Sequence, residues 1–575
     1  RWRIEPSDSA AYRRGELVRP VKQLVFYIDS LMPVKWNPYI KAGAESWNKA
    51  FEKIGFKDVI CVKEFPKNDT LFNANSFDCM TIRYSASWLN SAQTTIHSDT
   101  RTGEILNASI LINANMISVQ YADRIGATVA IDPRVRTTVF PQEIQGELIQ
   151  AAIAQAVGTG LGLTMNWGAS CAYPVDSLRS ASFTQKYGLA SSVMGGVIIN
   201  DVATEEDVRN GVCLVNAKPG PYDELVIKYL YQPIYASSLQ EEKETLDSWI
   251  REHTGDPYYA YIRNQSRFDS DPRNSRGSLG DDHLKSFDYM LPNVRKGFEN
   301  YYSWFAKEDR DFLMRRRVHS ALSERLSGRI YAILSYIGGI YLNDIREKDA
   351  IPSYSMVDRE KQKAALSKAL ELAKNLDWVD DTAHLNEFEI SDKKADRLRL
   401  DIFNGIFGRL PYVEVCTERF PDAAYTASEY LDDIYGIVWE GVLKHRPLEN
   451  FERALQTAFL ESIISTSTAT APIGSFKASK TGFAATGKPE INLAALRNGG
   501  KVDMKMYSLQ NAEEVAGFSS IPPIYTNQTK IAAYYFDLLM RTKDMLKKAI
   551  STAPEADRSH YDLLIYRINK ATEIE

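Results

Sequence analysis

The sequence predicts an α+β protein, with a mixed region up to about residue 300 and a mainly α-helical region over residues 301–575. Strand-like and helix-like patterns share the first 113 residues, a long helix follows whose residues from 148 onward carry no charge, and helical patterns dominate beyond residue 358. Such an order of elements, without a regular strand–helix repeat, is typical of the α+β class. No internal repeat recurs at a fixed spacing, so a solenoid or propeller is not expected.

The first region contains short runs whose alternation or β-branched content predicts strands. One helix is expected between the first two strands, over residues 36–56. Its apolar residues Ile40, Ala44, Trp47, Phe51 and Ile54 are spaced by three or four positions and so share a face. The predicted strands are Gln23–Asp29, Asp58–Glu64, Cys79–Ser85, Gln93–Ser98 and Ile105–Asn113.

A second, longer helix is expected over Glu143–Leu163, and the stretches 116–140 and 164–300 around it are expected to be irregular. The charge-free run Leu148–Val175 is long enough to span a membrane, which needs about 20 apolar residues. Polar residues and glycines interrupt this run, so we expect a buried amphipathic helix and no transmembrane span. The strong hydrophobes at i, i+4 spacing are Ile149, Ile153, Val157 and Leu161.

The second region, from residue 301 onward, shows helical patterns. In Asp358–Leu376 the apolar positions share a face, and the stretch 426–443 opens with a capping box made of Thr426 and Glu429. Two further helices are expected over Asn450–Ile464 and Lys530–Ile550.

The composition is that of an ordinary globular protein, with 44% hydrophobic and 25% charged residues. The formal net charge is -5, so nothing favours a nucleic-acid partner or a basic membrane-binding surface. The five cysteines are widely spaced and odd in number, which predicts free thiols. The chain begins with Arg1 and not Met, so we expect a processed or excised piece whose signal segment lies outside it.

Residues 155–166 (QAVGTGLGLTMN), near the end of the long helix, form the candidate site. Positions 155 and 159 lie one turn apart on one helix face, and Gly162 stands where a helix can end. This spacing is similar to that of metzincin proteases, in which three His bind zinc, a Glu activates water and a Met turn lies below. Here Gln155, Thr159 and Met165 occupy the ligand positions, Ala156 the general-base position, and Met194 in SSVMGG is the Met-turn candidate.

Other stretches, most specifically within residues 1–300, support the same relationship. They include RWRIEPSD, PVKQLVFYID, KWNPYIKAGAESWNKAFEKIGF, DTRTGEIL, CAYPVDS, SSVM, GPYDELVIKYLY and DPRNSRGSLGDD. Together with the motif they resemble the large zinc-dependent metalloproteases of Gram-negative bacteria that contain a Met-zincin domain. The resemblance implies a metzincin-like domain over residues 1–300, followed by a helical region of unassigned role. It also implies a zinc cofactor for the family and an extracytoplasmic location, in the periplasm, the outer membrane or the medium.

The chain departs from the family pattern His-Glu-Val-Gly-His-Thr-Leu-Gly-Leu-x-His-Asn at each chemical position. All three histidines and the glutamate are absent, and Gly195 and Gly196 follow Met194 where the family has Asp-Tyr. Gln, Thr and Met side chains are poor zinc ligands, and no histidine lies between His97 and His253, so we predict that zinc is absent. The matching positions are Val157, Gly158, Leu161, Gly162, Leu163 and Asn166.

These observations leave three classes of function. The first is a pseudoprotease, a catalytically inactive homologue that binds a peptide or protein partner in its cleft within the cell envelope. The second is an active metallopeptidase or other hydrolase with a non-standard site. The third is a purely structural envelope protein.

Overall fold

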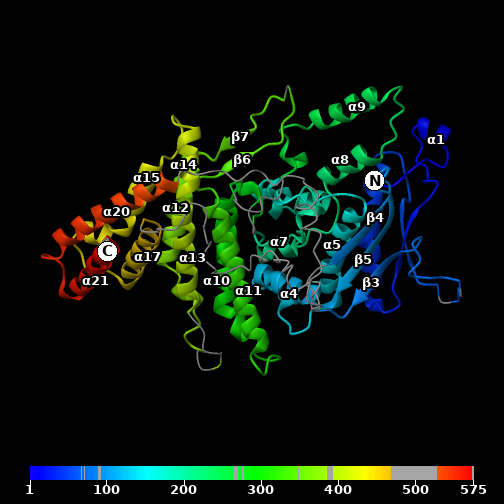
Figure 1. The fold of residues 1–575 in the computed structure, drawn as a ribbon. Helices are drawn as coiled ribbons and strands as arrows, with labels where there is room; N and C mark the ends of the chain where they lie inside the picture. Colours follow the sequence, from blue (N-terminus) through cyan, green and yellow to red (C-terminus); the bar gives the residue numbers. More distant parts are fainter. Residues whose placement is uncertain are drawn as a thin grey trace, which may run out of the picture. The chain divides into compact units, whose positions relative to one another are not determined.

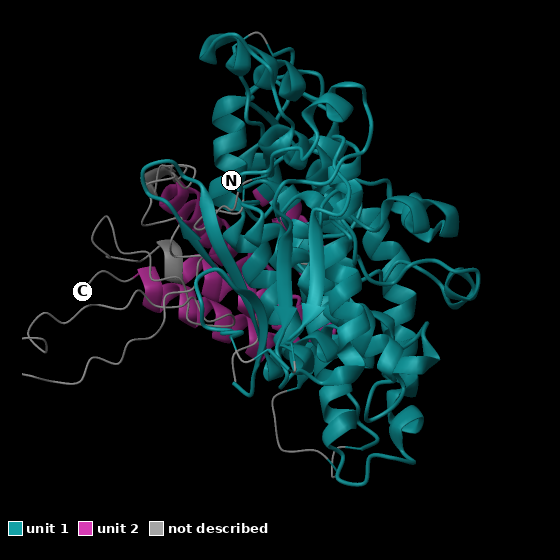
Figure 2. Ribbon diagram, turned by 90° about the vertical axis from the view of Figure 1, so that its right-hand side faces the viewer, with its two compact units in different colours: residues 1–265, 269–430 teal, residues 266–268, 431–575 magenta. Residues whose placement is uncertain are grey.

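The protein is described by a computed structural model that covers residues 1–66, 68, 69, 71–87, 92–262, 270–274, 278–347, 349–384, 387, 393–467 and 528–572. Among these, residues up to Tyr430 form one compact unit and residues from Leu431 a second (Figure 2). This division differs from the expected one near residue 300, which falls inside helix α10 (His283–Phe305) of the first unit. The mixed region and the first helices of the helical region therefore share one unit.

The first unit contains a five-stranded sheet in the order β2-β1-β3-β5-β4, of which Figure 1 labels β3, β4 and β5. Neighbouring strands run parallel except for β4, which pairs antiparallel with β5 and forms one edge of the sheet. The five strand predictions are confirmed to within two residues. The strands are β1 (Leu24–Ile28), β2 (Ile60–Glu64), β3 (Met80–Ser85), β4 (Ala92–Ser98) and β5 (Ile105–Asn113), and a separate hairpin contains β6 (Ile340–Leu342) and β7 (Tyr354–Met356).

Helix α5 (Gln142–Gly160) packs against β4 and β5 (Figure 1), and helix α2 (Asn37–Glu45) packs against α5. The predicted stripe of Ile149, Ile153, Val157 and Leu161 is buried, each residue being at most 1% exposed. The amphipathic character that we expected is wrong, because α5 is buried on nearly every side. Beyond its first two residues, only Glu147, Gln150, Gln155 and Thr159 are half-buried.

The single helix expected over residues 36–56 is two helices, α2 (Asn37–Glu45) and α3 (Asn48–Glu52). The five apolar residues of the predicted face are all buried. The buried face was therefore predicted correctly, but the prediction of one continuous helix was wrong. The side chain of Trp47 lies at the break, where its Nε1–H donates to the Ala154 carbonyl of α5 at 2.8 Å. This bond attaches the turn between the two helices to α5.

The prediction of irregular chain over 116–140 and 164–300 is wrong in part. Helix α4 (Ala114–Thr128) buries the polar residues Gln120, Arg124 and Thr128, which hide its apolar period in the sequence. Arg124 is buried because Asp132 accepts a hydrogen bond from its guanidinium at 2.7 Å. The other helices before residue 306 are α1 (Ser9–Arg13), α6 (Ala181–Tyr187), α7 (Glu205–Arg209), α8 (Pro221–Tyr231), α9 (Leu239–Arg251) and α10; 3₁₀ turns lie at Val34–Trp36 (η1), Pro133–Val135 (η2), Ala169–Cys171 (η3), Val175–Arg179 (η4), Val193–Gly195 (η5), Pro257–Tyr259 (η6) and Pro272–Asn274 (η7).

The helical character expected beyond residue 300 is confirmed. The predicted capping box at α15 is present, since Glu429 N–H donates to Thr426 Oγ1 at 3.3 Å and Thr426 N–H donates to Glu429 Oε2 at 3.2 Å. The helices are α11 (Leu313–Leu334), α12 (Arg359–Lys374), α13 (Lys394–Gly408), α14 (Leu410–Arg419), α15 (Ala427–Val438), α16 (Glu440–Leu443), α17 (Asn450–Ser467), α20 (Gln528–Ala549) and α21 (Glu555–Thr572), with a 3₁₀ turn at Asp377–Val379 (η8).

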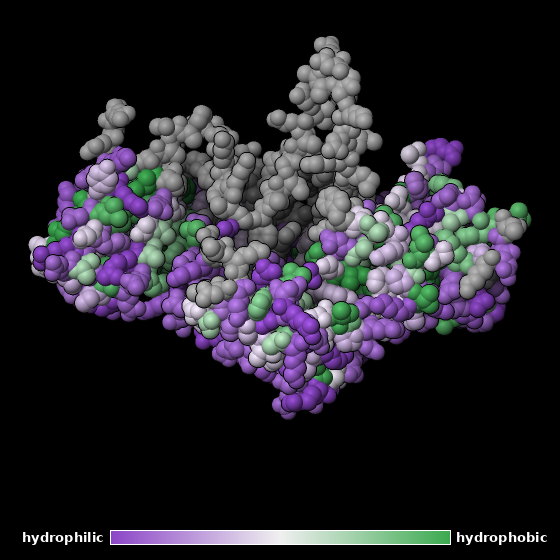
Figure 3. All heavy atoms as spheres, turned by 90° about the horizontal axis from the view of Figure 1, so that it is seen from below, coloured by the Kyte–Doolittle hydropathy of each residue, from purple (hydrophilic) through white to green (hydrophobic). Residues whose placement is uncertain are grey.

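The described surface on the face drawn in Figure 3 is mainly hydrophilic, with hydrophobic residues in separate small groups. Scattered apolar residues of this kind are normal on folded domains. Within the described ranges, no helix combines the length and the apolar character needed to cross a membrane. The charge-free run from Leu148 belongs to α5 and to the turns after it.

Candidate functional site

The candidate site lies where α5 ends beside the edge strand of the sheet. Gly162 has a φ of +92°, a left-handed conformation that glycine adopts without strain and that turns the chain out of the helix. Strand β4 is attached to α5 by Thr94, whose Oγ1 donates to the Ala156 carbonyl at 2.9 Å. The site therefore has a helix along one side and an antiparallel edge strand along another.

The structure brings two of the three ligand-position side chains into contact. Gln155 Nε2 lies 3.2 Å from Met165 Sδ, so the amide donates to the thioether. Thr159 Oγ1 lies 3.4 Å from the Gln155 carbonyl, the usual bond of a helical Thr to the preceding turn. All three residues are half-buried, whereas Ala156 is 5% exposed and contributes only its carbonyl, to Thr94.

Met194 lies beneath α5, in η5. Its side chain is fully buried, and a Cβ built on Gly158 would be 2.5 Å from Met194 Sδ and 2.6 Å from the Trp47 ring. Only glycine at position 158 allows this close approach. Asn166 N–H donates to the Met194 carbonyl at 3.1 Å, which joins this turn to the chain that leaves α5.

A buried carboxylate that the sequence analysis did not single out holds the turn before Met194. Asp223, at the start of α8, accepts hydrogen bonds from Ser192 Oγ at 2.5 Å and from Val193 N–H and Gly220 N–H at 2.9 Å. Burial raises the pKa of Asp223 to about 7, although these three donors act in the opposite direction. The short spacing from Gly220 to Asp223 at a helix start was the only sequence signal, because Ser192 lies about thirty positions earlier.

A segment far along the chain covers the exit from α5. The Asn166 side chain donates to the Ala260 carbonyl at 2.9 Å and accepts from Ile262 N–H at 3.1 Å. Thr164 Oγ1 donates to the Tyr261 hydroxyl at 3.3 Å. The position of Met165 is thus fixed on both sides by contacts that require no metal.

The residues at these positions do not fit a zinc ion. Zinc in proteins is bound by thiolate, imidazole or carboxylate, and the site offers an amide, a hydroxyl and a thioether. The amide N–H is directed at Met165 and the Thr159 hydroxyl at the helix backbone, so neither is arranged as a metal ligand. Elsewhere in the described ranges, no three His, Cys, Asp or Glu side chains are grouped so that they could hold a metal ion.

A helix ended by glycine, an antiparallel edge strand beside it and a methionine turn below it define a zincin-type domain of the metzincin kind. A family model described as Met-zincin matches residues 137–446 of the 575-residue chain, and the chain belongs to this Met-zincin family. The family and the fold class predicted from the sequence are therefore confirmed. No curated protein and no solved structure matched the chain.

Proposed function

We propose that this protein is a pseudoprotease, a catalytically inactive metalloprotease homologue that binds a peptide or protein along strand β4, beside α5. The observation that carries the proposal is the state of the motif positions. Gln155 and Met165 bond to each other, Thr159 bonds to the helix, and Ala156 has no group that transfers a proton. Metal-assisted hydrolysis needs a bound metal and a base that activates water, and these four side chains supply neither.

The binding part of the proposal rests on the two edges of the sheet. At the β2 edge, side chains already occupy backbone amides: Asn48 Oδ1 accepts from Ile60 N–H at 2.9 Å and Glu45 Oε1 from Val62 N–H at 3.1 Å. At the β4 edge, in the described part of the chain, no side chain bonds to a backbone amide of the strand. An open edge strand can pair with an extended peptide, and the open edge here is the one beside α5.

The hydrogen bond from Thr94 to Ala156 supports use of this edge without a metal. It fixes β4 against α5 through a side chain and a helix carbonyl, neither of which depends on zinc ligands. We further infer an extracytoplasmic location in the cell envelope, which rests on the family resemblance alone.

The test combines metal analysis, peptidase assays and hydrogen exchange on the whole purified chain. We expect no stoichiometric zinc after dialysis and no chelator-sensitive peptidase activity. About one zinc per chain with chelator-sensitive hydrolysis would establish an active metallopeptidase instead.

Hydrogen exchange with a peptide library then separates a binding protein from a purely structural one. Bound peptides should slow exchange of the β4 amides and leave those of β2 unchanged, because the β2 amides already have side-chain acceptors. Equal or absent protection at both edges would contradict peptide docking on β4.

A further inference from the structure

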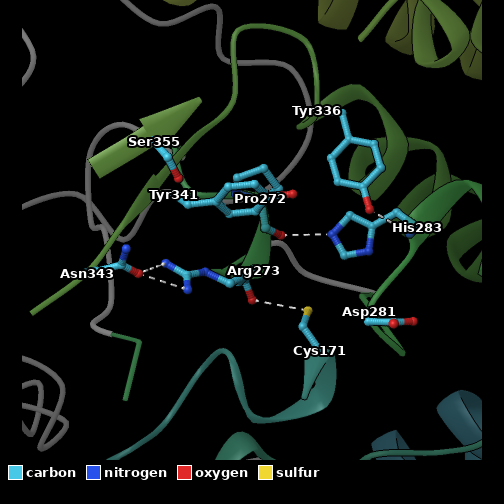
Figure 4. Close-up of a pocket in the computed structure, with 9 residues that line it drawn as sticks. All are labelled: Cys171, Pro272, Arg273, Asp281, His283, Tyr336, Tyr341, Asn343 and Ser355. Carbon is cyan, nitrogen blue, oxygen red and sulfur yellow. Dashed lines mark hydrogen bonds between the residues drawn. The ribbon is translucent and has the colours of Figure 1, made fainter. Parts of the chain in front are cut away.

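A pocket of about 320 Å³ in the first unit is lined by polar groups that already bond within the protein (Figure 4). His283 Nε2 lies 2.9 Å from the Pro272 carbonyl, and Cys171 Sγ donates to the Arg273 carbonyl at 3.5 Å. The Arg273 guanidinium in turn donates to the buried carboxylate of Asp271 at 2.6 Å. These groups are therefore not free for a ligand, and the edge of β4 offers more to a partner.

Strand β4 has the sequence of an edge that accepts another strand. Residues 92–97 (AQTTIH) include no charged residue and no proline, the residues with which exposed edge strands usually prevent pairing. A register shift between His97 and Ser98 interrupts the regular ladder with β5. A partner strand would therefore pair along residues 92–97.

The side chains of β4 alternate between the two faces of the sheet. Thr94 faces α5, since its hydroxyl donates to the Ala156 carbonyl at 2.9 Å. Ala108 of β5 lies on the same face, because a Cβ built on Gly160 of α5 would be 3.3 Å from the Ala108 Cβ. His97, three positions after Thr94, is on the opposite face and is exposed. This face of the sheet is thus separate from positions 155, 159 and 165.

The ring of Phe77 lies beside His97 on this second face. The two ring centroids are 5.7 Å apart, and Phe77 is 53% exposed. Asn107, which is opposite His97 in β5, donates through Nδ2 to the Phe77 carbonyl at 2.7 Å and to the Cys79 carbonyl at 3.2 Å. Asn107 is 5% exposed, so a buried amide fixes the segment before β3 through its backbone. The exposed ring is therefore held in place before any partner binds.

A strand paired with β4 would place one of its side chains next to these rings. Residues opposite each other in an antiparallel pair have Cβ atoms about 4.5–5.5 Å apart, and long or aromatic side chains also reach the diagonal neighbours. An aromatic side chain fits best, since rings pack at centroid distances of about 4.5–7 Å and would cover exposed ring surface. Asp78, beside Phe77, is exposed as well, but an exposed ion pair adds little, so a basic side chain gains less.

We propose that the segment bound along β4 is an extended peptide with an aromatic side chain, which packs against His97 and Phe77 on the face of the sheet opposite α5. This inference rests on the proposed function, since it narrows the peptide bound there to one class. Pairing of the backbones supplies the binding, and the two rings supply the preference for one side chain over another.

The test compares three acetylated and amidated heptapeptides on the whole chain. They are Thr-Ser-Thr-Phe-Thr-Ser-Thr and its two versions with Ser or Lys at the centre. Hydrogen exchange of the β4 amides is followed as the peptide concentration rises. We expect the Phe peptide to reach half of its full protection at about a fivefold lower concentration than the Ser peptide, the size of one cross-strand aromatic contact. The Lys peptide should resemble the Ser peptide.

Two variants locate the contact. Phe77→Ser combined with His97→Thr removes both rings and should abolish the advantage of the Phe peptide. The Ser peptide, which relies on backbone pairing, should protect β4 in this variant as before. Leu71→Ser is the control, because it removes a 91% exposed apolar side chain from the same segment before β3 and should retain the advantage.

The outcomes separate this inference from the proposed function. Equal protection by the Phe and Ser peptides, or an advantage for the Lys peptide, would overturn the inference and leave peptide binding on β4 intact. An advantage that persists without the two rings would overturn it as well. No protection by any peptide would overturn the proposed function and the inference with it. Protection without peptide that grows with protein concentration would identify a second copy of the chain as the occupant of β4, and would also overturn the inference.

Discussion

The buried and the half-exposed sides of α5 differ in what they retain of the Met-zincin motif. On the buried side, Val157 and Gly158 match the family pattern; Val157 lies in the same core as Trp47 and Met194, and Gly158 packs directly against both. On the half-exposed side, Gln155 and Thr159 stand where the resemblance to the family places zinc ligands, and both bond within the protein. On this one helix, the residues that pack the core match the family pattern, whereas the residues at the ligand positions do not.

This difference shows which part of the motif the fold itself requires. Glycine at 158 is needed because Met194 and Trp47 fill the space that a side chain would occupy, whatever lies on the opposite face. The ligand positions are less constrained, since their side chains are only half-buried, although Met165 also packs against the core. A domain of this fold can therefore be well packed without zinc ligands at these positions.

The largest effect is expected for a charge on the buried side. Val157→Asp places an unpaired carboxylate at a fully buried position and should destabilise the first unit by more than about 3 kcal/mol. Gln155→Asp, two residues away and half-exposed, is the matched control and should cost less than about 1 kcal/mol. Thermal unfolding of both variants measures the difference, and equal melting temperatures would mean that the two sides are not distinct.

The next effect concerns the pH dependence that Asp223 introduces below Met194. Its pKa rises from 3.8 to about 7 on folding, so the folded protein holds a proton that the unfolded chain releases. The free energy of unfolding should therefore fall as pH rises from about 4 to 7 and then level off, by a few kcal/mol at most at about 1.4 kcal/mol per pKa unit.

Asp223→Asn is the matched control, because an amide can accept from Val193 and Gly220 and donate to Ser192 without titrating. Denaturant unfolding of the variant should lack this slope. The same slope in both proteins would assign it to another group.

Much of this contrast was predictable from the sequence, because local periodicity encodes it. The strands and the stripe on α5 follow from alternation and i, i+4 spacing, and the positions of Gln155, Gly162 and Met165 follow from the motif. The break at Trp47 was not predictable, since the apolar spacing continues through it while the chain turns.

Contacts between polar residues that are far apart in the sequence could not be predicted from local patterns. Helix α4 was missed because its buried Arg124 is paired with Asp132, and a sequence does not show that pairing in advance. The contact between Asp223 and Ser192 depends likewise on the fold.

A smaller effect is expected from adding a single methyl group under α5. Gly158→Ala places a Cβ 2.5 Å from Met194 Sδ and 2.6 Å from the Trp47 ring, an overpacking that should cost about 1–3 kcal/mol. Gly160→Ala is the control on the same helix, because its nearest neighbour, the Ala108 Cβ, is 3.3 Å away. Chemical denaturation should rank Gly158→Ala as the less stable variant, and the opposite order would contradict the close packing of Met194.

The smallest effect on stability is expected from restoring the ligands on the half-exposed side. Gln155→His, Thr159→His and Met165→His change side chains that are half-buried, so the apo variant should unfold within about 1 kcal/mol of the parent. The contact of Gln155 Nε2 with Met165 Sδ at 3.2 Å already places two of these positions within reach of one ion. Three neutral histidines with an open fourth position form a workable zinc site, so we expect zinc binding that the parent lacks.

Catalysis should not return with the metal, even when Ala156→Glu is added as the general base. Ala156 is buried and its carbonyl bonds to Thr94, so a new carboxylate there must find room between α5 and β4. Groups that orient the ligands also matter, and Gly195 and Gly196 offer no side chains for that purpose. Isothermal titration with zinc, followed by a peptidase assay, separates the two outcomes. Zinc affinity equal to that of the parent would show that the four positions do not correspond to the protease motif. Strong hydrolysis would contradict the expectation, because it would show that the other residues around α5 already suffice for catalysis.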